Sequence, residues 1–481
     1  MIWTARTIDE TAWRAVTADL VQGRRTLAGL WGAPGVVRMA VHGEGEAVVL
    51  ALPCPAGAYP SVGAHHAAAI RLERALVDLY GLRPEGALDA RPWLDHGRWP
   101  VRHPLGAAQA GAGPVPYGFL PAEGENLHQI PVGPVHAGII EPGHFRFTAA
   151  GETVVRLEAR LGYLHRGLEQ RMTGADLDLA VRLAGRASGD STVAYAIAFA
   201  RAVEAALGVE APPRAHWLRA LMAELERLAN HLGDIGAVCN DASFALMHAH
   251  CGVLREQVLR AADAAFGHRL MMDRVVAGGA AGDLTPEAAR LIAVMARDLS
   301  PRLDQIAGLY DDTASLQDRT VGTGHLRPEF AARFGAGGFV GRASGRAFDA
   351  RKAFPYPPYD ALAFEVPTRD AGDVNARVWI RIEEARQSLA LVAQLLAGLP
   401  GGPIRAPVPD GAGEGAALVE GFRGDVFAWV KLEGGKVEGA SLRDPSWFQW
   451  PLLEAAIEGN IVADFPLCNK SFNCSYAGVD L

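Results

Sequence analysis

The segment from His216 to Leu232, HWLRALMAELERLANHL, decides the fold class of the larger part of this chain. Arg219, Glu226 and Arg227 lie mostly off its apolar stripe, and this spacing predicts a long helix with one buried face. The apolar residues recur at steps of three and four: Leu218, Leu221, Met222, Leu225, Leu228, Ala229 and Leu232.

A second long helix is predicted from Val374 to Ala397, where apolar residues recur at the same steps. The sequence GLPGGP, residues 398–403, ends it, because glycine and proline do not continue a helix. The chain after the first hundred residues is therefore predicted to be mainly helical.

The first hundred residues have a different pattern. Apolar runs at 36–41 and 47–52 are separated by turn residues and predict strands, and residues 67–79 fit a helix. Residues 106–124 begin with a stretch rich in Gly, Ala and Pro. The sequence therefore predicts an α+β domain over 1–105, a linker over 106–124 and a second domain over 125–481.

Composition narrows the function classes. The chain has 481 residues, a net charge of −8 and a pI near 6.0, which argue against nucleic acid as a partner. Five cysteines form no CxxC pair and no even set, so a disulfide framework is not expected and a reducing cytoplasm is the default. No stretch of about 18 uncharged apolar residues occurs, and the N-terminus is not that of a signal peptide.

Eight blocks of sequence stand out between about residue 128 and the C-terminus. The blocks are GPVHAGIIEPGHFRF from Gly133, RLEARLGYLHRGLE to Glu169, RLAGRASGDSTVAYAIAFARAVE to Glu204, AELERLANHLGDIGAVCND to Asp241, GHRLMMDRVVAGG from Gly267, DRTVGTG from Asp318, GDVNARVWIRIEEARQSL from Gly372 and RDPSWFQWPLLEAAIEGNIVADFPL from Arg443. In one order, they resemble the large subunit of complex I-related, energy-converting nickel-iron hydrogenases and its relative, the quinone-site subunit of respiratory complex I. The N-terminal part resembles, more weakly, the small complex I subunit that is fused ahead of the large one in some relatives.

The resemblance implies that the metal ligands are lost. In the hydrogenases two CxxC pairs hold nickel and iron, since soft thiolates suit these metals. The pattern RxCGxCxxAH, placed from Arg186, puts Ser188 and Ser191 at the first pair. The second pair falls on Ser475 and Gly478, whereas a register shifted by one residue would retain Cys474 as a single thiolate. Neither register supplies a binuclear centre, so this chain is expected to bind no metal or other cofactor.

The comparison with complex I also shows losses. The quinone-facing histidine of that family falls on Ile140 and its tyrosine on Gly185, whereas His136 matches only the first histidine of the pattern GPxHPAxHG. A quinone therefore stays open as a ligand, with the lost pair replaced by other residues near His136, Tyr195 and Asp190.

Ionisable residues that could move protons or line a cavity are Glu169, His136 and Asp190. Glu169 matches the glutamate that carries protons in the hydrogenases, a task that suits a buried carboxylate with a raised pKa. The alternative is an ion pair of Glu169 with Arg166 or Arg171. His144 and His165 could line a polar cavity with His136, although structural hydrogen bonding is the commoner role of such histidines.

Charged residues of the block from Gly372 form a further set. An ion-pair network at a subunit contact is the favoured interpretation of this set over a catalytic one. Its members are Asp373, Arg377, Arg381, Glu383, Glu384 and Arg386.

The predicted function is that of a non-hydrogenase large subunit in a membrane-bound, complex I-like respiratory complex, linking redox or conformational change to ion translocation. The expected partners are a small iron-sulfur subunit that carries a [4Fe-4S] cluster and antiporter-like integral membrane subunits. The chain would lie peripherally on the cytoplasmic face of the cell membrane. The alternatives are a quinone-reducing subunit of a complex I-like oxidoreductase and a catalytically inert scaffold, so whether the chain is itself an enzyme stays open.

Overall fold

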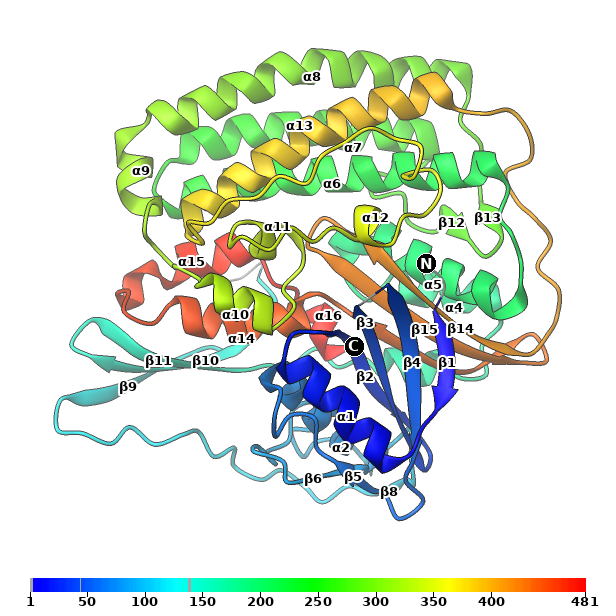
Figure 1. Ribbon diagram of the computed structural model, residues 1–481. Coiled ribbons are helices and arrows are strands. Elements are labelled where there is room, and N and C mark those ends of the chain that lie inside the picture. The colour runs from blue at the N-terminus through cyan, green and yellow to red at the C-terminus, as the bar shows by residue number, and fades with distance from the viewer. Residues whose placement is uncertain (1–2, 44, 137–139) are drawn as a thin grey trace.

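A computed structural model describes residues 3–43, 45–136 and 140–481 of the chain. Figure 1 shows a blue N-terminal sheet below, an orange sheet from the C-terminal part in the middle and long helices above. Residues 137–139, inside the block that begins at Gly133, lie outside the described residues.

The N-terminal sheet has the strand order β1-β4-β3-β2, formed by β1 (Thr4–Thr7), β2 (Thr26–Ala33), β3 (Val36–Gly43) and β4 (Glu46–Pro53). The pair β1–β4 is parallel and the other pairs are antiparallel. Helices α1 (Glu10–Val21) and α2 (Ile70–Tyr80) share an apolar core with one face of the sheet. The strands predicted at 36–41 and 47–52 are confirmed, and the predicted helix begins as the 3-10 turn η1 (Ala67–Ala69) before α2.

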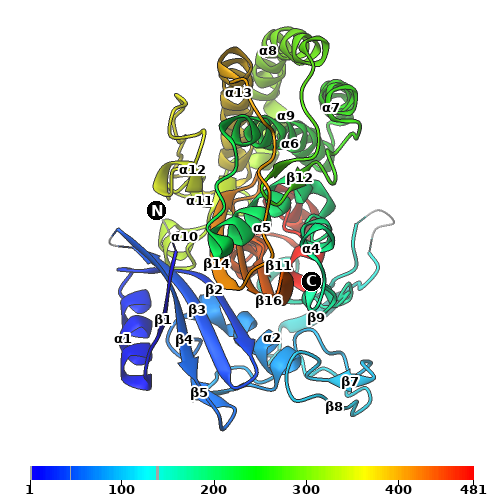
Figure 2. The same cartoon turned by 90° about the vertical axis from the view of Figure 1, so that its right-hand side faces the viewer.

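The other face of this sheet packs on a second sheet. Trp31 of β2 and Val49 of β4 join Phe427 and Trp429 in a core separate from the one that the helices share with the sheet. The second sheet has the antiparallel order β14-β15-β16, with β14 (Gly413–Glu420), β15 (Asp425–Glu433) and β16 (Lys436–Arg443). Figure 2 shows β2 and β16 next to each other. The N-terminal sheet is thus attached to the C-terminal part of the chain.

Short strands connect the two parts. They are β5 (Ala58–Pro60), β6 (Arg83–Glu85), β7 (Val101–Arg102), β8 (Gln109–Ala110), β9 (Leu127–Val132), β10 (His144–Ala150) and β11 (Thr153–Arg160). The sheet β11-β10-β9 extends to the left in Figure 1. Residues 106–124 are mostly exposed, as expected of a connection.

Long helices form the upper layer: α6 (Pro213–Asp241), α7 (Ala245–Phe266), α8 (Pro286–Asp312) and α13 (Val374–Gly398). Helix α5 (Thr192–Leu207) packs on β14 and β15 below them. The two predicted long helices are confirmed as parts of α6 and α13. The remaining elements are α3 (Leu168–Met172), α4 (Leu177–Ala184), η2 (Gly189–Ser191), β12 (Val275–Val276), β13 (Gly279–Ala280), α9 (Ala314–Thr320), α10 (Pro328–Arg333), α11 (Gly338–Arg342), α12 (Ala350–Ala353), α14 (Ser446–Ala456), η3 (Val462–Asp464), α15 (Phe465–Phe472) and α16 (Ala477–Asp480).

The prediction of a single buried face on α6 is wrong. Arg219, Glu226 and Arg227 are all buried, with at most 7% of their surface exposed. Arg219 is paired with Glu204, and Arg227 donates hydrogen bonds to the carbonyl oxygens of residues 420 and 421. These partners satisfy the charges and donors, so the helix is buried on its polar side as well.

The prediction that the charged set on α13 lies at a subunit contact is also wrong for its inner members. Arg377, Arg381 and Glu384 are fully buried within this chain. Asp373 caps α13 by accepting a hydrogen bond from the backbone of Ala376 at 2.7 Å. Only Glu383 and Arg386 keep substantial exposure, with 28% and 43% of their side-chain surfaces accessible.

Within the described residues, no helix combines the length and the apolar character that crossing a membrane requires.

Candidate functional site

The two serine-bearing segments meet in the structure, although they lie far apart in the sequence. The hydroxyl oxygens of Ser188 and Ser475 are 2.9 Å apart. Ser188 donates to Oδ1 of Asp190 at 2.7 Å, so its single proton is used and Ser475 is the donor between the two serines. The backbone N–H of Gly478 donates to the Ser475 hydroxyl at 2.9 Å. The positions that the resemblance assigns to metal ligands therefore do converge.

An ion pair lies beside these serines. Arg423, in the turn between β14 and β15, donates to both carboxylate oxygens of Asp190 and, at 3.2 Å, to the Ser191 hydroxyl. Its Nε donates to the carbonyl oxygen of Asn473. Arg423 thus connects the segment around Asp190, the β14–β15 turn and the segment before Ser475.

The charges of this pair stabilise each other. Burial acts to raise the pKa of Asp190, but the Arg423 guanidinium and the hydrogen bonds from Ser188 and Ser191 outweigh burial and hold that pKa below its ordinary value. The side chain of Asp190 is 37% exposed, whereas that of Arg423 is 3% exposed. Asp190 is therefore an ionised group at the outer edge of the site. For Asp190 to take up a proton, its ion pair with Arg423 would have to break.

A second carboxylate faces Gly478. Asp444 accepts a hydrogen bond from the Tyr195 hydroxyl at 2.7 Å and one from the backbone of Ser446 at 2.8 Å. Burial, followed by the charge of Asp444, raises the pKa of Tyr195 well above its ordinary value. A Cβ atom on Gly478 would come within 2.6 Å of Oδ2 of Asp444, so a side chain at position 478 requires Asp444 to move.

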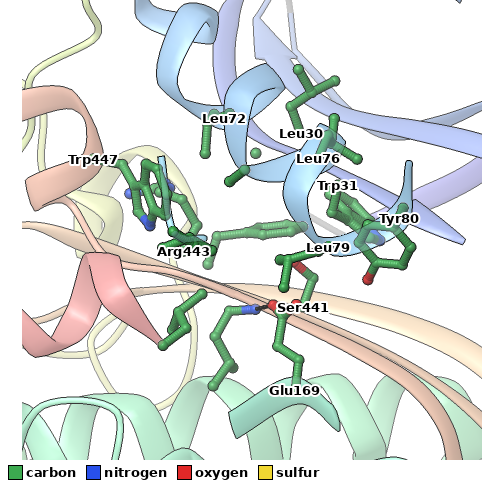
Figure 3. A pocket seen from close by; sticks show the side chains of 16 residues that line it. Leu30, Trp31, Leu72, Leu76, Leu79, Tyr80, Glu169, Ser441, Arg443 and Trp447 are labelled. Atoms are coloured by element: carbon green, nitrogen blue, oxygen red, sulfur yellow. Dashed lines mark hydrogen bonds between the residues drawn. The ribbon is translucent and has the colours of Figure 1, made fainter. Parts of the chain in front are cut away.

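Glu169 lies elsewhere, at the contact with the N-terminal sheet. Figure 3 shows it pointing from α3 toward Ser441, below Leu79 and Tyr80 of α2. It accepts a hydrogen bond from the backbone of Leu442 at 3.1 Å, and burial raises its pKa to about 7. Burial and a raised pKa are the conditions that suit proton transfer, and the role of Glu169 in proton transfer stays a prediction.

The alternative ion pair of Glu169 is wrong. Arg166 donates instead to the carbonyl oxygens of Arg186 and Ala187, and Arg171 donates to the carbonyl of Arg166. Glu169 therefore shares a cavity with Tyr80 and Trp31 of the N-terminal part, and no hydrogen bond found among the described residues joins it to the serines or to Asp190.

The pKa of Glu169 leads to a testable pH dependence. Between pH 4.5 and about 7 the native carboxyl keeps a proton that the unfolded chain releases, so its contribution to stability falls as the pH rises through this window. Glu169→Gln removes this loss and retains the acceptor for Leu442. We expect the variant to gain up to about 3 kcal/mol of unfolding free energy over the native chain at pH near 8, and almost nothing near pH 4.

Denaturant unfolding at several pH values measures this effect. The matched control is Glu329→Gln, which changes an exposed carboxylate of α10 and should leave the pH profile unaltered. Glu226 and Asp480, with pKa values of about 8 and about 7, contribute slopes of the same sign and stay in both proteins. Equal profiles for Glu169→Gln and the native chain would show that Glu169 is ionised in the fold at neutral pH.

The three candidate histidines do not line a common cavity in the described part of the chain. His136 packs against the rings of Phe145 and Tyr476, and burial lowers its pKa. His144 interacts with the carbonyl of Gly133 at 3.3 Å, and His165 with the carbonyl of Asp480 at 2.7 Å. His144 and His165 have the structural hydrogen bonds that were the alternative for these residues.

Glu169, His136 and Asp190 thus occupy three separate places. We call Ser188, Ser191 and Ser475, together with Asp190, Arg423 and Asp444 beside them, the serine cluster. The sequence analysis did not single out Arg423 or Asp444. Arg423 stands between Phe422 and Gly424 in a turn without periodicity. The sequence shows only an arginine in a turn with glycines, a pattern that is too common to indicate a functional site.

Comparisons with known proteins show the family of this chain. Residues 242–412 match the family described as respiratory-chain NADH dehydrogenase, 49 Kd subunit. The carbon monoxide-induced hydrogenase of Rhodospirillum rubrum is 33% identical over 352 residues, which are 72% of this chain and 98% of that protein. This chain belongs to the family of complex I 49-kDa subunits and their hydrogenase relatives. The resemblance read from the sequence is confirmed.

A second relative covers more of the chain, and a solved structure is similar to the chain in fold. Formate hydrogenlyase subunit 5 of Escherichia coli is 31% identical over 438 residues, 88% of this chain and 77% of that protein. The structure of the membrane-bound sulfane sulfur reductase, an archaeal respiratory membrane complex, matches with a TM-score of 0.70 and 27% identity over 74% of this chain and 99% of that one.

The residues of this large subunit do not fit a nickel-iron centre. Nickel and iron in such sites require thiolates, but the convergent positions offer two hydroxyls from Ser188 and Ser475, the hydroxyl of Ser191 and no side chain at Gly478. Among the described residues, no three His, Cys, Asp or Glu side chains are grouped so that they could hold a metal ion. Cys474 is buried in the apolar core, and this burial raises the pKa of its thiol.

Proposed function

We propose that this chain is the non-hydrogenase large subunit of a membrane-bound, complex I-like respiratory complex. The observation that carries this proposal is the serine cluster with its Arg423–Asp190 pair. The family fold still brings the two ligand segments together, with a Ser188–Ser475 distance of 2.9 Å, but it fills their meeting point with hydroxyls and a guanidinium. This retained arrangement without thiolates supports the proposal that the subunit assembles as its relatives do but performs no hydrogen chemistry.

In this proposal the chain packs beside a small iron-sulfur subunit, whose [4Fe-4S] cluster would be the nearest redox group. Antiporter-like integral membrane subunits would complete the complex and hold this chain peripherally on the cytoplasmic face of the membrane. Its role would be to link redox or conformational change to ion translocation. The relatives named for membrane-bound or quinone-reducing complexes support this arrangement.

The proposed domain plan has the same basis. Residues 1–105 would correspond to the small complex I subunit, 106–124 to a linker and 125–481 to the large subunit. The independent N-terminal sheet and the exposed run at 106–124 support this division.

A second candidate function is quinone reduction. The observation that favours it is the buried Tyr195–Asp444 pair at the serine cluster, since the Tyr195 hydroxyl, which donates its one proton to Asp444, could still accept a hydrogen bond from a ligand hydroxyl such as that of a quinol. His136 has no hydrogen bond to this pair among the described contacts. A third candidate is an inert scaffold, which an isolated gene without iron-sulfur and antiporter-like neighbours would favour.

The deciding test is the nickel and iron content of the native complex, purified by a tag on this chain from cells grown with nickel. We expect iron from the partner subunit, no nickel and no hydrogen uptake. The double variant Ser188→Cys, Ser191→Cys should still hold no nickel, because positions 475 and 478 still supply no thiolate and Asp444 lies where a side chain at position 478 would have to sit. Stoichiometric nickel or hydrogen uptake by the unmodified complex would contradict the proposal.

A further inference from the structure

A cavity of about 460 Å³ lies at the seam between the N-terminal sheet and the rest of the chain. We call it the seam cavity. Its walls come from the β2–β3 turn, the end of α2, residues 104–106, α3 and strands β15 and β16. The volume is in the range of pockets that hold small molecules. It is separate from the serine cluster, because none of the serines, Asp190 or Arg423 lines it.

Arg38 of β3 is the unusual residue in this wall. It is 91% buried, since only 9% of its surface is exposed, and its guanidinium donates no hydrogen bond in the described structure. Its nearest carboxylate is Glu414 at 3.8 Å, and Glu414 already accepts a hydrogen bond from Trp429 at 2.7 Å. The guanidinium stacks on the Trp429 ring, 4.8 Å from its centroid. A buried cation with unused donors is costly unless a further acceptor completes its shell.

The other charges around the cavity limit what this acceptor can be. Lys431 is already paired with Glu438 at 2.7 Å, and Glu169 contributes a carboxyl that burial tends to keep protonated. Arg38 thus offers unused N–H donors but a single positive charge, part of which Glu414 at 3.8 Å already balances, and Glu438 lies nearby. This set matches a single negative charge better than a phosphate dianion. Apolar wall residues, namely Pro34, Tyr80, Pro104, Leu105 and Trp429, suit an apolar body.

We propose that the seam cavity binds a small monocarboxylate with an apolar body, whose carboxylate is held by Arg38. The carboxylate would accept hydrogen bonds from the free N–H groups of the Arg38 guanidinium, and the apolar body of the ligand would lie between Tyr80 and Trp429. Since the wall combines both sheets, such a ligand would also strengthen the attachment of the N-terminal sheet. This inference does not depend on the proposed function, because it would hold for an enzyme, a coupling subunit or a scaffold.

Equilibrium dialysis of radiolabelled benzoate against the purified native complex tests the proposal, with neutral benzamide and inorganic phosphate as competitors. We expect one benzoate per chain, with a dissociation constant on the order of 1 mM or tighter. Benzamide should not compete, and phosphate should compete only weakly. Arg38→Gln should weaken benzoate binding by about tenfold or more. Arg6→Gln, which changes an exposed arginine of the same sheet, should leave it intact.

A second variant covers the case in which Arg38→Gln fails to assemble. Gln170 is exposed and lines the seam cavity, so Gln170→Trp should fill part of the cavity, leave Arg38 untouched and reduce benzoate binding. No benzoate bound to the native complex, or binding that neither variant weakens, would overturn the site. Tighter binding of phosphate than of benzoate would overturn the assignment to a monocarboxylate.

Discussion

Replacing Arg423 by methionine is expected to lower the free energy of unfolding by about 2–3 kcal/mol. The change removes the guanidinium that contacts Asp190, and it leaves the carbonyl of Asn473 and the hydroxyl of Ser191 without this donor. Breaking a fully buried pair by removing one partner costs roughly 3–5 kcal/mol. The expected value lies below most of that range, because Asp190 is 37% exposed and water can solvate the carboxylate that remains.

A double-mutant cycle separates the pair from other effects of the substitutions. Asp190→Asn alone should also destabilise, since it leaves the buried guanidinium of Arg423 unpaired, and the double variant should lose less than the sum of the two. Denaturant unfolding of the purified chain gives each value. Arg302→Met, on the exposed side of α8, is the matched control and should change stability by less than about 0.5 kcal/mol. Additive losses would mean that Arg423 and Asp190 do not interact.

This pair also explains why thiolates alone would not restore a metal centre. The Arg423 guanidinium forms hydrogen bonds that join separate segments of the chain. Burial acts to lower its pKa, but the negative charge of Asp190 outweighs this effect, so both members of the pair stay ionised. The pKa of Arg423 is raised accordingly. Any ligand that enters the serine cluster must therefore either bind at the exposed edge of Asp190 or break this pair.

The sequence predicted elements whose stabilisation is local and apolar. Helix α13 could be delimited because Asp373 caps its start and glycine and proline follow its end. Strands β3 and β4 could be placed because their apolar runs are short and separated by turn residues. The convergence of Ser188 with Ser475, 287 residues apart, was accessible only through the family resemblance.

The sequence could not predict which charged residues are buried. Periodicity places arginine and glutamate on the solvent side, but Arg227, Arg381 and Glu384 face partners on other elements that make burial tolerable. The partner of Arg423 is 233 residues away, and the docking of Glu169 against the N-terminal sheet depends on how two sheets pack. Such contacts leave no periodic trace in one sequence.

The largest loss of stability is expected on replacing Arg342, which lies at the centre of a buried ion-pair network with Glu384, Glu420 and Asp349. Its side chain is fully buried and contacts Glu384 at 2.6 Å, Glu420 at 2.9 Å and Asp349 at 3.7 Å. Arg342→Met leaves Glu384 with His231 and Asp349 with Arg351, but removes from Glu420 its only ion-pair partner among the described residues. We expect a loss of roughly 3–5 kcal/mol or more, which is a large part of the stability of a typical domain.

The pH dependence of this loss identifies its cause. Burial, and next to it the charge of Asp349, already raises the pKa of Glu420 to about 7, and loss of Arg342 should raise it further. The carboxyl of Glu420 would then keep its proton in the fold but lose it in the unfolded chain, so the penalty from Glu420 should be absent near pH 5 and largest above pH 7. The loss of the Arg342–Glu384 pair persists at both pH values, because Glu384 is ionised at both. Adding Glu420→Gln to Arg342→Met should recover part of the loss at pH 8, whereas Arg290→Met on the surface of α8 should cost almost nothing. If the loss of unfolding free energy does not change with pH and Glu420→Gln does not relieve it, the cause is lost packing and not the unpaired charge of Glu420, because packing energy does not depend on protonation.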